Sequence, residues 1–371
     1  MSVIFYISGH GFGHASRDVE VINAIGDRLD APIVIRTSVS PDLLKRTLRV
    51  PVDLRPGICD TGIVQASSVS HDDPATVAAA AAFYADFPRR VDDEVARLAD
   101  VDVELIVGDI PPLAFATAAA LGVPSVAVGN FTWDWIYETQ PGLLPDGAAI
   151  IDLIRTCYRG VDLAIELPFS GGFEVFSRVT RVPLVARRST QPADATRAFF
   201  GLPARGRVAL LSFGGYGLPS LDLAAVDCRD DWTIVTTDRV TNGTATPPHV
   251  RRIVEREFLE SAFRYEDLVA AADVVMTKPG YGIIGECIST GTGLVYTPRG
   301  PFREYDVLVD ALPRLVRSAF ISHDDLFAGR WRAPLEATLA QPDPPEHMEP
   351  TGAEVAADII LRALDDARNR A

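Results

Sequence analysis

A glycine-rich segment with two histidines follows the first apolar stretch of the chain. It reads SGHGFGHASR from Ser8 to Arg17 and places His10 and His14 four residues apart. Glycine-rich turns from a strand into a helix commonly bind phosphate, because the helix N-terminus offers unpaired N–H groups and the positive end of its dipole. Histidine also suits proton transfer, because its ordinary pKa lies near the working pH. The segment therefore predicts a loop that binds phosphate or carries a catalytic base.

Two familiar phosphate loops can be compared with this segment. A Walker A loop needs a lysine followed by Ser or Thr, and residues 9–16 contain no lysine, so a P-loop is excluded. The dinucleotide fingerprint GxGxxG begins with Gly9 and Gly11, but His14 stands at its third glycine. The next strand pattern, APIVIRTSV, ends without the acidic residue that would bind an NAD ribose, although Arg36 could meet an NADP phosphate. Nicotinamide binding stays as an alternative.

Both histidines have more than one possible role. His14 could cap the first turn of a helix without taking part in catalysis, but its place in a glycine loop favours a functional role. His10 could be a competing base or could bind a substrate phosphate. Metal ligation by the pair is disfavoured, because residues four apart share a face only on a helix. We therefore expect no metal site here.

Three further loops carry residues suited to chemistry. They are GDIPP at 108–112, SFGGYG at 212–217 and TKPGYG at 277–282, each directly after a strand-like run. In doubly wound sheets ligands bind beyond the carboxyl ends of the strands, where such loops lie. The glycines of the last two loops would let the backbone approach a diphosphate, and Lys278 would add a charge that stabilises a leaving group. A solvated surface lysine is the alternative for Lys278.

The segment NFTWDWIYETQPG at 130–142 is the richest aromatic stretch of the chain. Rings interspersed with carboxylates can bind a sugar or a flat acceptor through stacking and hydrogen bonds. Packing in the core explains the same pattern equally well. In the binding interpretation, the acceptor site comprises His10, Phe12, Trp133, Asp134 and Trp135.

Composition and charge limit the class of protein. A chain of 371 residues predicts two domains, and 47% hydrophobic with 23% charged residues is typical of a globular protein. The net charge of −15 disfavours nucleic acid and anionic membranes as partners. The four cysteines are widely spaced, as in reduced proteins, and no run reaches the length of about 20 apolar residues that spans a bilayer. We expect a soluble cytoplasmic protein.

The strand and helix patterns predict an α/β fold with two similar units in tandem. Short β-branched runs such as VIFYI, PIVIRT and VELIVG alternate with alanine-rich helical stretches, and the alternation begins again near Gly206. We expect an N-terminal domain over 1–186, a linker over 187–206, a C-terminal domain over 207–345, and a helix over 346–371 that packs back on the first domain.

The motifs resemble those of the GT-B glycosyltransferases, which include MurG-like enzymes and plant UDP-sugar glycosyltransferases. The segments SGHGFGHASR, GDIPPLAFATAAALGVPSVAVGNFTWDWIY and KPGYGIIGECISTGTGLVYTPR are also similar to the N-terminal glycosyltransferase-like region of L-arabinokinases. The resemblance covers nearly the whole chain but includes no sugar-kinase domain, so arabinose phosphorylation is not expected. It implies two Rossmann-like doubly wound domains facing across a cleft.

The resemblance also implies roles for individual residues. His14 would be the base that takes the acceptor's proton, and Asp109 would orient it. Glu286 would bind the ribose hydroxyls of the nucleotide. The full expected donor site comprises Gly214, Gly215, Phe263, Arg264, Lys278, Gly280, Tyr281, Gly282, Glu286, Arg303 and Glu304.

These observations predict a metal-independent, inverting glycosyltransferase without a cofactor. It would move a hexose from a nucleotide sugar, UDP-linked, to a hydroxyl of a small acceptor. The alternatives are a nucleotide-sugar 2-epimerase and a sensor that binds a nucleotide sugar without consuming it.

Overall fold

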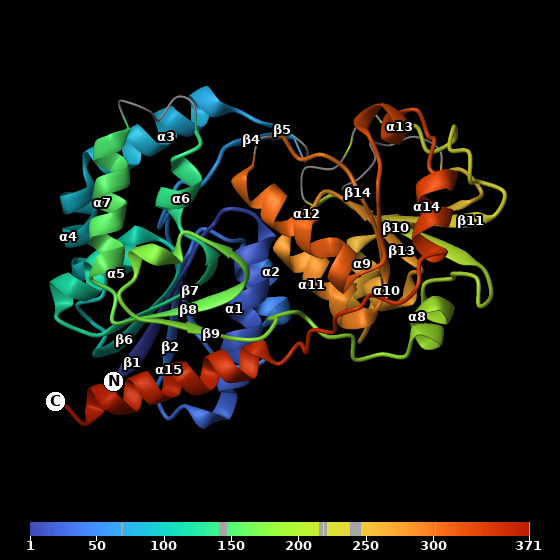
Figure 1. Ribbon diagram of the computed structural model, residues 1–371. Helices are drawn as coiled ribbons and strands as arrows, with labels where there is room; N and C mark the ends of the chain where they lie inside the picture. The colour runs from blue at the N-terminus through green and yellow to red at the C-terminus, as the bar shows by residue number, and fades with distance from the viewer. Residues whose placement is uncertain are drawn as a thin grey trace. The chain divides into compact units, whose positions relative to one another are not determined.

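The computed structural model describes residues 1–67, 70–140, 147–214, 218, 221–237, 246–300 and 302–370. The chain divides into two compact units (Figure 1). Unit 1 comprises Met1–Val64, Asp72–Val185 and Pro350–Ala371, and unit 2 comprises Gln65–His71 and Ala186–Glu349. The segment 187–206, expected to be a linker, thus lies within unit 2, where Ala193–Phe199 form helix α8.

Unit 1 is built on a sheet of seven parallel strands in the order β3-β2-β1-β6-β7-β8-β9. The strands are β1 (Ser2–Ile7), β2 (Ile33–Thr37), β3 (Asp53–Pro56), β6 (Val103–Asp109), β7 (Ser125–Phe131), β8 (Leu163–Gly171) and β9 (Val179–Arg181). From β1 the chain first adds strands on one side and then, from β6, on the other. The point between β1 and β6 is therefore a topological switch point, where sheets of this kind bind ligands.

Helices cover both faces of this sheet, because successive side chains of a strand point to opposite faces. Phe5 and Ile7 of β1 lie in the apolar cluster shared with α1 and α15, whereas Tyr6 donates a 3.0 Å hydrogen bond to Glu94 of α4. The helices are α1 (Phe12–Ile25), η1 (Gly26–Arg28), α2 (Pro41–Thr47), α3 (Asp73–Ala85), α4 (Phe87–Arg97), α5 (Pro112–Leu121), α6 (Trp133–Tyr137), α7 (Ala148–Arg159), η2 (Phe173–Val175) and α15 (Gly352–Arg368).

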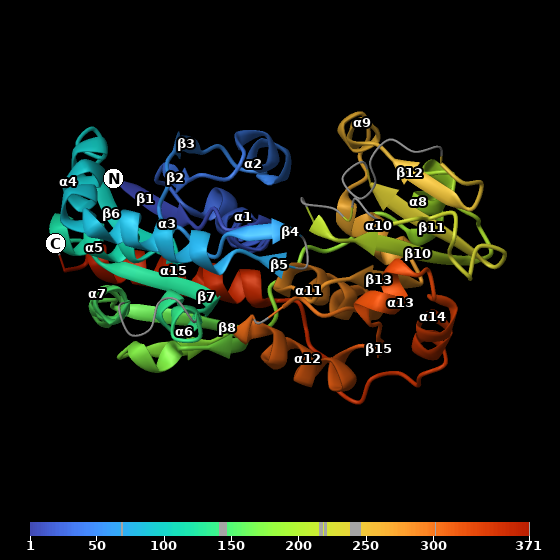
Figure 2. The ribbon, with the colours of Figure 1, turned by 90° about the horizontal axis from the view of Figure 1, so that it is seen from above.

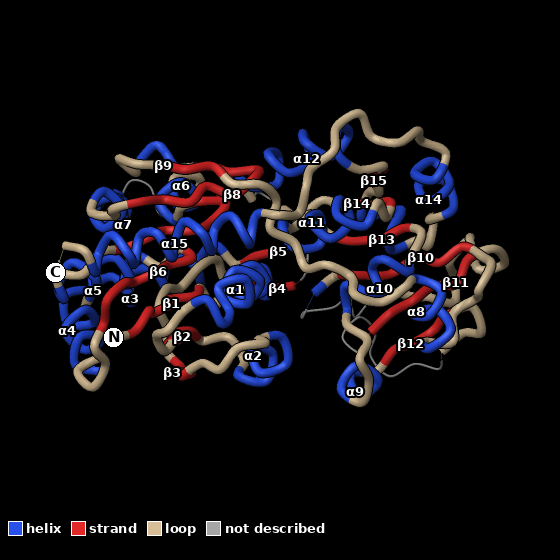
Figure 3. Tube along the Cα trace, turned by 90° about the horizontal axis from the view of Figure 1, so that it is seen from below, coloured by secondary structure: helices blue, strands red, loops and turns tan. Residues whose placement is uncertain are grey.

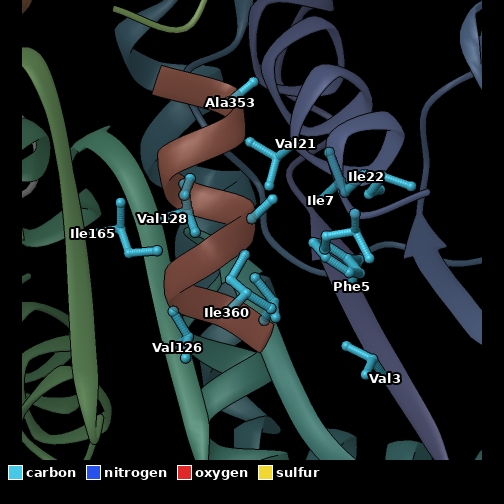
Figure 4. Packing of buried hydrophobic residues seen from close by; sticks show 14 of the residues in the cluster. Val3, Phe5, Ile7, Val21, Ile22, Val126, Val128, Ile165, Ala353 and Ile360 are labelled. Carbon is cyan, nitrogen blue, oxygen red and sulfur yellow. The ribbon is translucent and has the colours of Figure 1, made fainter. Parts of the chain in front are cut away.

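The C-terminal helix α15 belongs to unit 1, where it packs against α1 and β6 (Figures 1 and 3). Its apolar face includes Ala353 and Ile360, which point toward Val126, Val128 and residues of α1 in Figure 4. Ile360 is 1% exposed, and burying such a side chain stabilises the fold by about 1.5–3 kcal/mol.

Unit 2 contains a second parallel sheet, in the order β12-β11-β10-β13-β14-β15. Figure 2 shows β11, β10 and β13 side by side. The strands are β10 (Arg207–Ser212), β11 (Trp232–Thr237), β12 (Val250–Ile253), β13 (Val274–Thr277), β14 (Gly293–Tyr296) and β15 (Ser318–Phe320), and the antiparallel pair β4 (Gln65–Ser67) and β5 (Ser70–His71) lies in the same unit. The strand order changes direction between β10 and β13, which is the switch point of this unit.

The second sheet also has helices on both faces. Leu335 of α14 and Trp331, which directly precedes this helix, lie in the same apolar cluster as Leu211 of β10 and Phe213, which directly follows this strand. The helices after α8 are α9 (Glu255–Leu259), α10 (Tyr265–Ala271), α11 (Tyr281–Thr290), α12 (Arg303–Leu315), α13 (His323–Phe327) and α14 (Arg332–Leu339). None of the helices in the described ranges is both long and apolar enough to cross a bilayer.

Candidate functional site

The parallel pairing of β1 and β6 brings the first predicted pair of residues together. Ile7, the last residue of β1, lies beside Asp109, the last residue of β6. The chain then passes through the glycine loop into α1, whose first turn carries His14. Both residues therefore lie at the carboxyl edge of the sheet, at the switch point of unit 1.

His14 and Asp109 form a buried hydrogen bond. Nδ1 of His14 lies 2.8 Å from Oδ1 of Asp109, and the two residues are 4% and 1% exposed. Burial opposes ionisation of Asp109, but the charges of Arg17 and His14 and their hydrogen bonds lower its pKa to about 2. An ionised Asp109 accepts a hydrogen bond from the Nδ1–H of His14, so Nε2 of His14 is the atom that can take up a proton.

Arg17 is a third member of this cluster, and it was missed in the sequence analysis. Its Nη2 lies 2.9 Å from Oδ2 of Asp109, 3.2 Å from Oδ1 and 3.1 Å from Nδ1 of His14. A signal was present, because His14 and Arg17 are three residues apart and so share one face of α1.

Two further buried carboxyl groups surround the cluster. Oδ2 of Asp60 accepts a 2.9 Å hydrogen bond from Nε1 of Trp133, and burial raises the pKa of Asp60, with Ser8 and His14 acting in the opposite direction. Burial and the neighbouring Asp109 raise the pKa of Asp18 well above its usual range. The pKa values of the neighbouring carboxyl groups Asp18 and Asp109 are thus shifted in opposite directions.

The predicted acceptor residues on the aromatic segment differ in burial: Trp133 and Asp134 are buried, whereas Trp135 is half-buried. Trp133 is 1% exposed and stacks on Tyr137, with ring centroids 5.8 Å apart, so its indole is part of the core. Asp134 is also buried and accepts a 3.1 Å hydrogen bond from Nε of Arg155. For these two residues the geometry favours the packing explanation. The half-buried Trp135 lies over Gly171, where an added Cβ would come within 2.4 Å of its ring.

His10 lies beside Trp133 and not in the His14–Asp109 cluster. Its ring meets that of Trp133 edge to face at 5.5 Å, and its Nδ1 accepts a 3.3 Å hydrogen bond from the backbone of Ile63. Gly62 permits this approach, since it has a φ of +59° and an added Cβ would lie 2.6 Å from the imidazole. The side chain of Phe12 lies outside the described residues.

In unit 2, the pairing of β10 and β13 brings the two predicted donor loops to one edge of the sheet. Ser212 at the end of β10 lies beside Thr277 at the end of β13. Gly214 has a φ of +70°, a conformation that favours glycine, and Gly215 lies outside the described residues.

The second donor loop ends at the N-terminus of α11. Gly280 precedes the helix, and Tyr281 and Gly282 begin its first turn. Among the described residues, no heavy atom comes within 4 Å of a Cβ added at Gly280 or Gly282. The backbone at these two glycines is thus not crowded by neighbouring side chains, which leaves room for a ligand at the N-terminus of the helix.

Lys278 is half-buried and lies two residues before Gly280, which precedes this helix. Its Nζ donates a 3.2 Å hydrogen bond to Oε1 of Gln65. Burial and the charge of Arg299 lower the pKa of Lys278 to about 7, with Glu304 acting in the opposite direction. The alternative of a solvated surface lysine is therefore wrong.

Arg303 and Glu304, the last two residues of the expected donor site, begin α12. Glu304 is 5% exposed and forms an ion pair with Arg299. Its carboxylate therefore neutralises a neighbouring guanidinium and is not an exposed ligand for a sugar. Arg303 is half-buried.

Glu286 is likewise paired with an arginine that was missed in the sequence analysis. Nε of Arg187 donates a 2.7 Å hydrogen bond to Oε1 of Glu286, which is 1% exposed. Arg187 also lies 3.4 Å from Glu266, and these two carboxylates raise its pKa although burial acts against them. Because Arg187 lies 99 residues from Glu286 in a segment expected to be a linker, the sequence contained no local signal for the pair.

The backbone N–H groups of Phe263 and Arg264, two residues of the expected donor site, form hydrogen bonds within the protein. The N–H of Arg264 donates to Asp267 at 2.8 Å, and the N–H of Phe263 donates to Ser261 at 3.2 Å. The Phe263 ring stacks on Phe199 with centroids 4.5 Å apart. Direct recognition of a base through these two N–H groups would require their present hydrogen bonds to break.

Comparison with solved structures gives the class of fold. The chain aligns with the glycotransferase of kitacinnamycin at a TM-score of 0.62 and 18% identity, over 98% of this chain and 99% of the other. A UDP-glucosyltransferase from Polygonum tinctorium aligns at a TM-score of 0.59 and 14% identity, over 98% of both chains. The protein thus has the GT-B fold, which confirms the fold class expected from the motifs.

Comparison with characterised sequences points to one plant protein. The chain is 28% identical over 364 residues to an L-arabinokinase from Arabidopsis thaliana, covering 96% of this chain. It spans 34% of the length of that relative. This similarity confirms the resemblance noted from the motifs, and no protein-family model matches the chain.

Proposed function

We propose that the protein is a glycosyltransferase that moves a hexose from a UDP-linked sugar to a hydroxyl of a small acceptor. The observation that carries this proposal is the buried hydrogen bond between His14 and Asp109 at the switch point of a GT-B fold. It supplies a histidine with a defined tautomer, which is what removal of a proton from a hydroxyl requires.

In the proposed reaction, Nε2 of His14 accepts the proton of the acceptor hydroxyl while the hydroxyl oxygen attacks the anomeric carbon. The bond from that carbon to the diphosphate oxygen breaks, and the nucleoside diphosphate leaves with the electron pair. Attack from the side opposite the leaving group inverts the anomeric centre. Asp109 remains ionised and stabilises the imidazolium that forms.

Unit 2 carries the groups proposed to hold the donor. The N-terminus of α11 offers N–H groups and a positive dipole end to the diphosphate, and Lys278 becomes a charged partner when a phosphate lies beside it. These groups make the proposed mechanism metal-independent, because they neutralise the leaving group themselves. The cytoplasmic location and the exclusion of nucleic acid stay predictions from cysteine spacing and net charge.

The first test is calorimetric titration with UDP, GDP, ADP, dTDP and NADPH at one salt concentration. Selective binding of UDP supports the donor site. Binding of NADPH alone contradicts it and returns the glycine loop to the dinucleotide alternative.

A nucleotide-sugar sensor is the second candidate. The similarity to an L-arabinokinase favours it, because this chain spans only 34% of that protein and could correspond to a region that binds a nucleotide sugar beside a kinase. Slow release of free hexose from UDP-glucose distinguishes the two, because a transferase passes the sugar to water when no acceptor is present and a sensor binds the donor unchanged. His14→Ala removes this hydrolysis if it depends on the proposed base.

A further inference from the structure

The position of Arg17 gives His14 a second charged neighbour. One nitrogen, Nη2 of Arg17, lies within 3.2 Å of both carboxylate oxygens of Asp109 and 3.1 Å from Nδ1 of His14. Arg17 and Asp109 are 4% and 1% exposed, so water screens this arrangement poorly. Since Nδ1 of His14 already donates to Asp109, Nη2 meets His14 as a neighbouring positive charge and not as its hydrogen-bond donor.

We propose that Arg17 is a positioning residue that holds Asp109 ionised against Nδ1 of His14 and keeps His14 uncharged and ready to accept a proton. This inference rests on the proposed function and assigns a part in it to a residue outside the expected base and its orienting carboxylate.

The charge balance of the cluster supports this role. Within the cluster formed by His14, Arg17 and Asp109, Arg17 carries one positive charge and Asp109 carries one negative charge. With neutral His14 the cluster therefore has no net charge. A carboxylate without the arginine would attract a proton to the imidazole, and a base that is already protonated cannot accept the proton of a hydroxyl.

Several charged or titratable groups lie near the imidazole of His14. Arg17 disfavours the imidazolium directly through like charge, and Asp109 favours it. Asp60 lies close enough to interact electrostatically with His14 from the segment after β3. The titratable or charged groups near the imidazole are Arg17 and Asp18 on α1, Asp109 at the end of β6, Asp60 after β3, and His10, whose ring also contacts Trp133.

The test measures protonation of His14 itself. The protein is labelled with ¹³C at Cε1 of histidine, the His14 signal is assigned by its loss in H14Q, and its titration midpoint is followed by NMR in the absence of substrates. In R17M we expect the midpoint to rise by about 1–3 pH units, because the imidazolium loses a like charge and gains an uncompensated carboxylate. R17K keeps the positive charge, so its His14 titration midpoint should lie closer to that of the wild-type protein.

The matched control is R49M. It removes an exposed arginine that forms an ion pair with Glu20, a residue of α1, the helix that also carries Arg17. Its His14 midpoint should be that of the wild-type protein. If R17M does not fold, R17Q makes the same prediction, because it removes the charge and retains a donor toward Asp109. A midpoint that stays unchanged or falls when the charge is removed overturns the proposal, since Asp109 would then have taken up the proton instead.

Activity provides the second readout. If UDP-glucose is hydrolysed, the acidic limb of the pH–rate profile of R17M should move to higher pH by the same interval, with activity recovered at about pH 9. A purely structural loss would lower the rate equally at all pH values and would contradict the inference. If no hydrolysis or transfer occurs but the NMR midpoint rises as expected, the proposed function fails and the role of Arg17 in controlling His14 stands.

Discussion

Each unit of the molecule contains a buried carboxylate that is bound by an arginine. In unit 1 Arg17 binds Asp109, and in unit 2 Arg187 binds Glu286. The two pairs differ in their third member, which is the titratable His14 in unit 1 and a second carboxylate, Glu266, in unit 2. The two arginines therefore have different roles: Arg17 lies beside a titratable histidine, whereas Arg187 compensates the negative charges of two carboxylates.

The pairs also differ in how the chain assembles them. His14 and Arg17 lie on one turn of α1, so only Asp109 has to be brought from another strand. Arg187 and Glu286 come from segments 99 residues apart, so packing of unit 2 must bring both together. The Arg17–Asp109 pair therefore depends mainly on the pairing of β1 with β6, whereas the Arg187–Glu286 pair depends on the packing of unit 2 as a whole.

The largest expected effect separates the chemical role of unit 1 from the binding role of unit 2. His14→Ala should lower the rate of transfer about 10²–10⁴-fold, the usual contribution of a general base, and leave UDP affinity nearly unchanged. Rates and UDP calorimetry on the same preparations check this. The exposed His347, changed to Ala, is the control. Loss of UDP binding in H14A would instead indicate that the glycine-rich loop around His14 binds phosphate.

Breaking the pair in unit 2 should mainly affect stability and nucleotide binding. Arg187→Met leaves Glu286 buried beside Glu266, and removal of one partner from a buried pair costs about 3–5 kcal/mol. The free energy of unfolding from urea titration and UDP affinity measured under folding conditions should both fall.

The control for this change is Arg314→Met, which breaks an exposed pair with Glu346. Exposed pairs contribute about 0–1 kcal/mol, so stability should hardly change. Equal stability of R187M and R314M would show that the pair in unit 2 is not a structural requirement.

The smallest expected effect is a pH dependence that belongs to unit 2. Lys278 has a pKa of about 7, lowered by burial and Arg299, so it is mostly uncharged at pH 8. A bound diphosphate favours the ammonium and raises this pKa, so UDP binding should take up a proton and weaken about tenfold from pH 7 to 8.5. Calorimetry in two buffers of different ionisation enthalpy measures the uptake.

Lys278→Met should abolish the proton uptake, and the exposed Lys45, changed to Met, should retain it. Proton uptake that is the same in K278M and the wild-type protein would place the titrating group elsewhere. This experiment also sharpens the comparison, because UDP binding should be insensitive to R17M.

Local sequence patterns were enough to predict much of the fold and part of the candidate site. Alternation of β-branched runs with alanine-rich stretches is enough to predict parallel sheets, because strands buried on both faces cannot carry polar residues regularly. The glycine-rich loops and Asp109 were found because they follow such strands directly. Arg187 was missed because its partner, Glu286, is distant in sequence, and Trp133 could be assigned to packing only after its burial was known.

The sequence by itself determined the α/β class, the loops at the carboxyl ends of the strands and the candidates His14 and Asp109. Tertiary structure alone decided which charges meet. Pairing of β1 with β6 placed Asp109 against His14 and Arg17, and packing of unit 2 buried Lys278 and joined Arg187 to Glu286. The physical reason is that periodicity reflects local burial, whereas the charge state of a side chain depends on the low dielectric and the neighbours that distant segments bring to it.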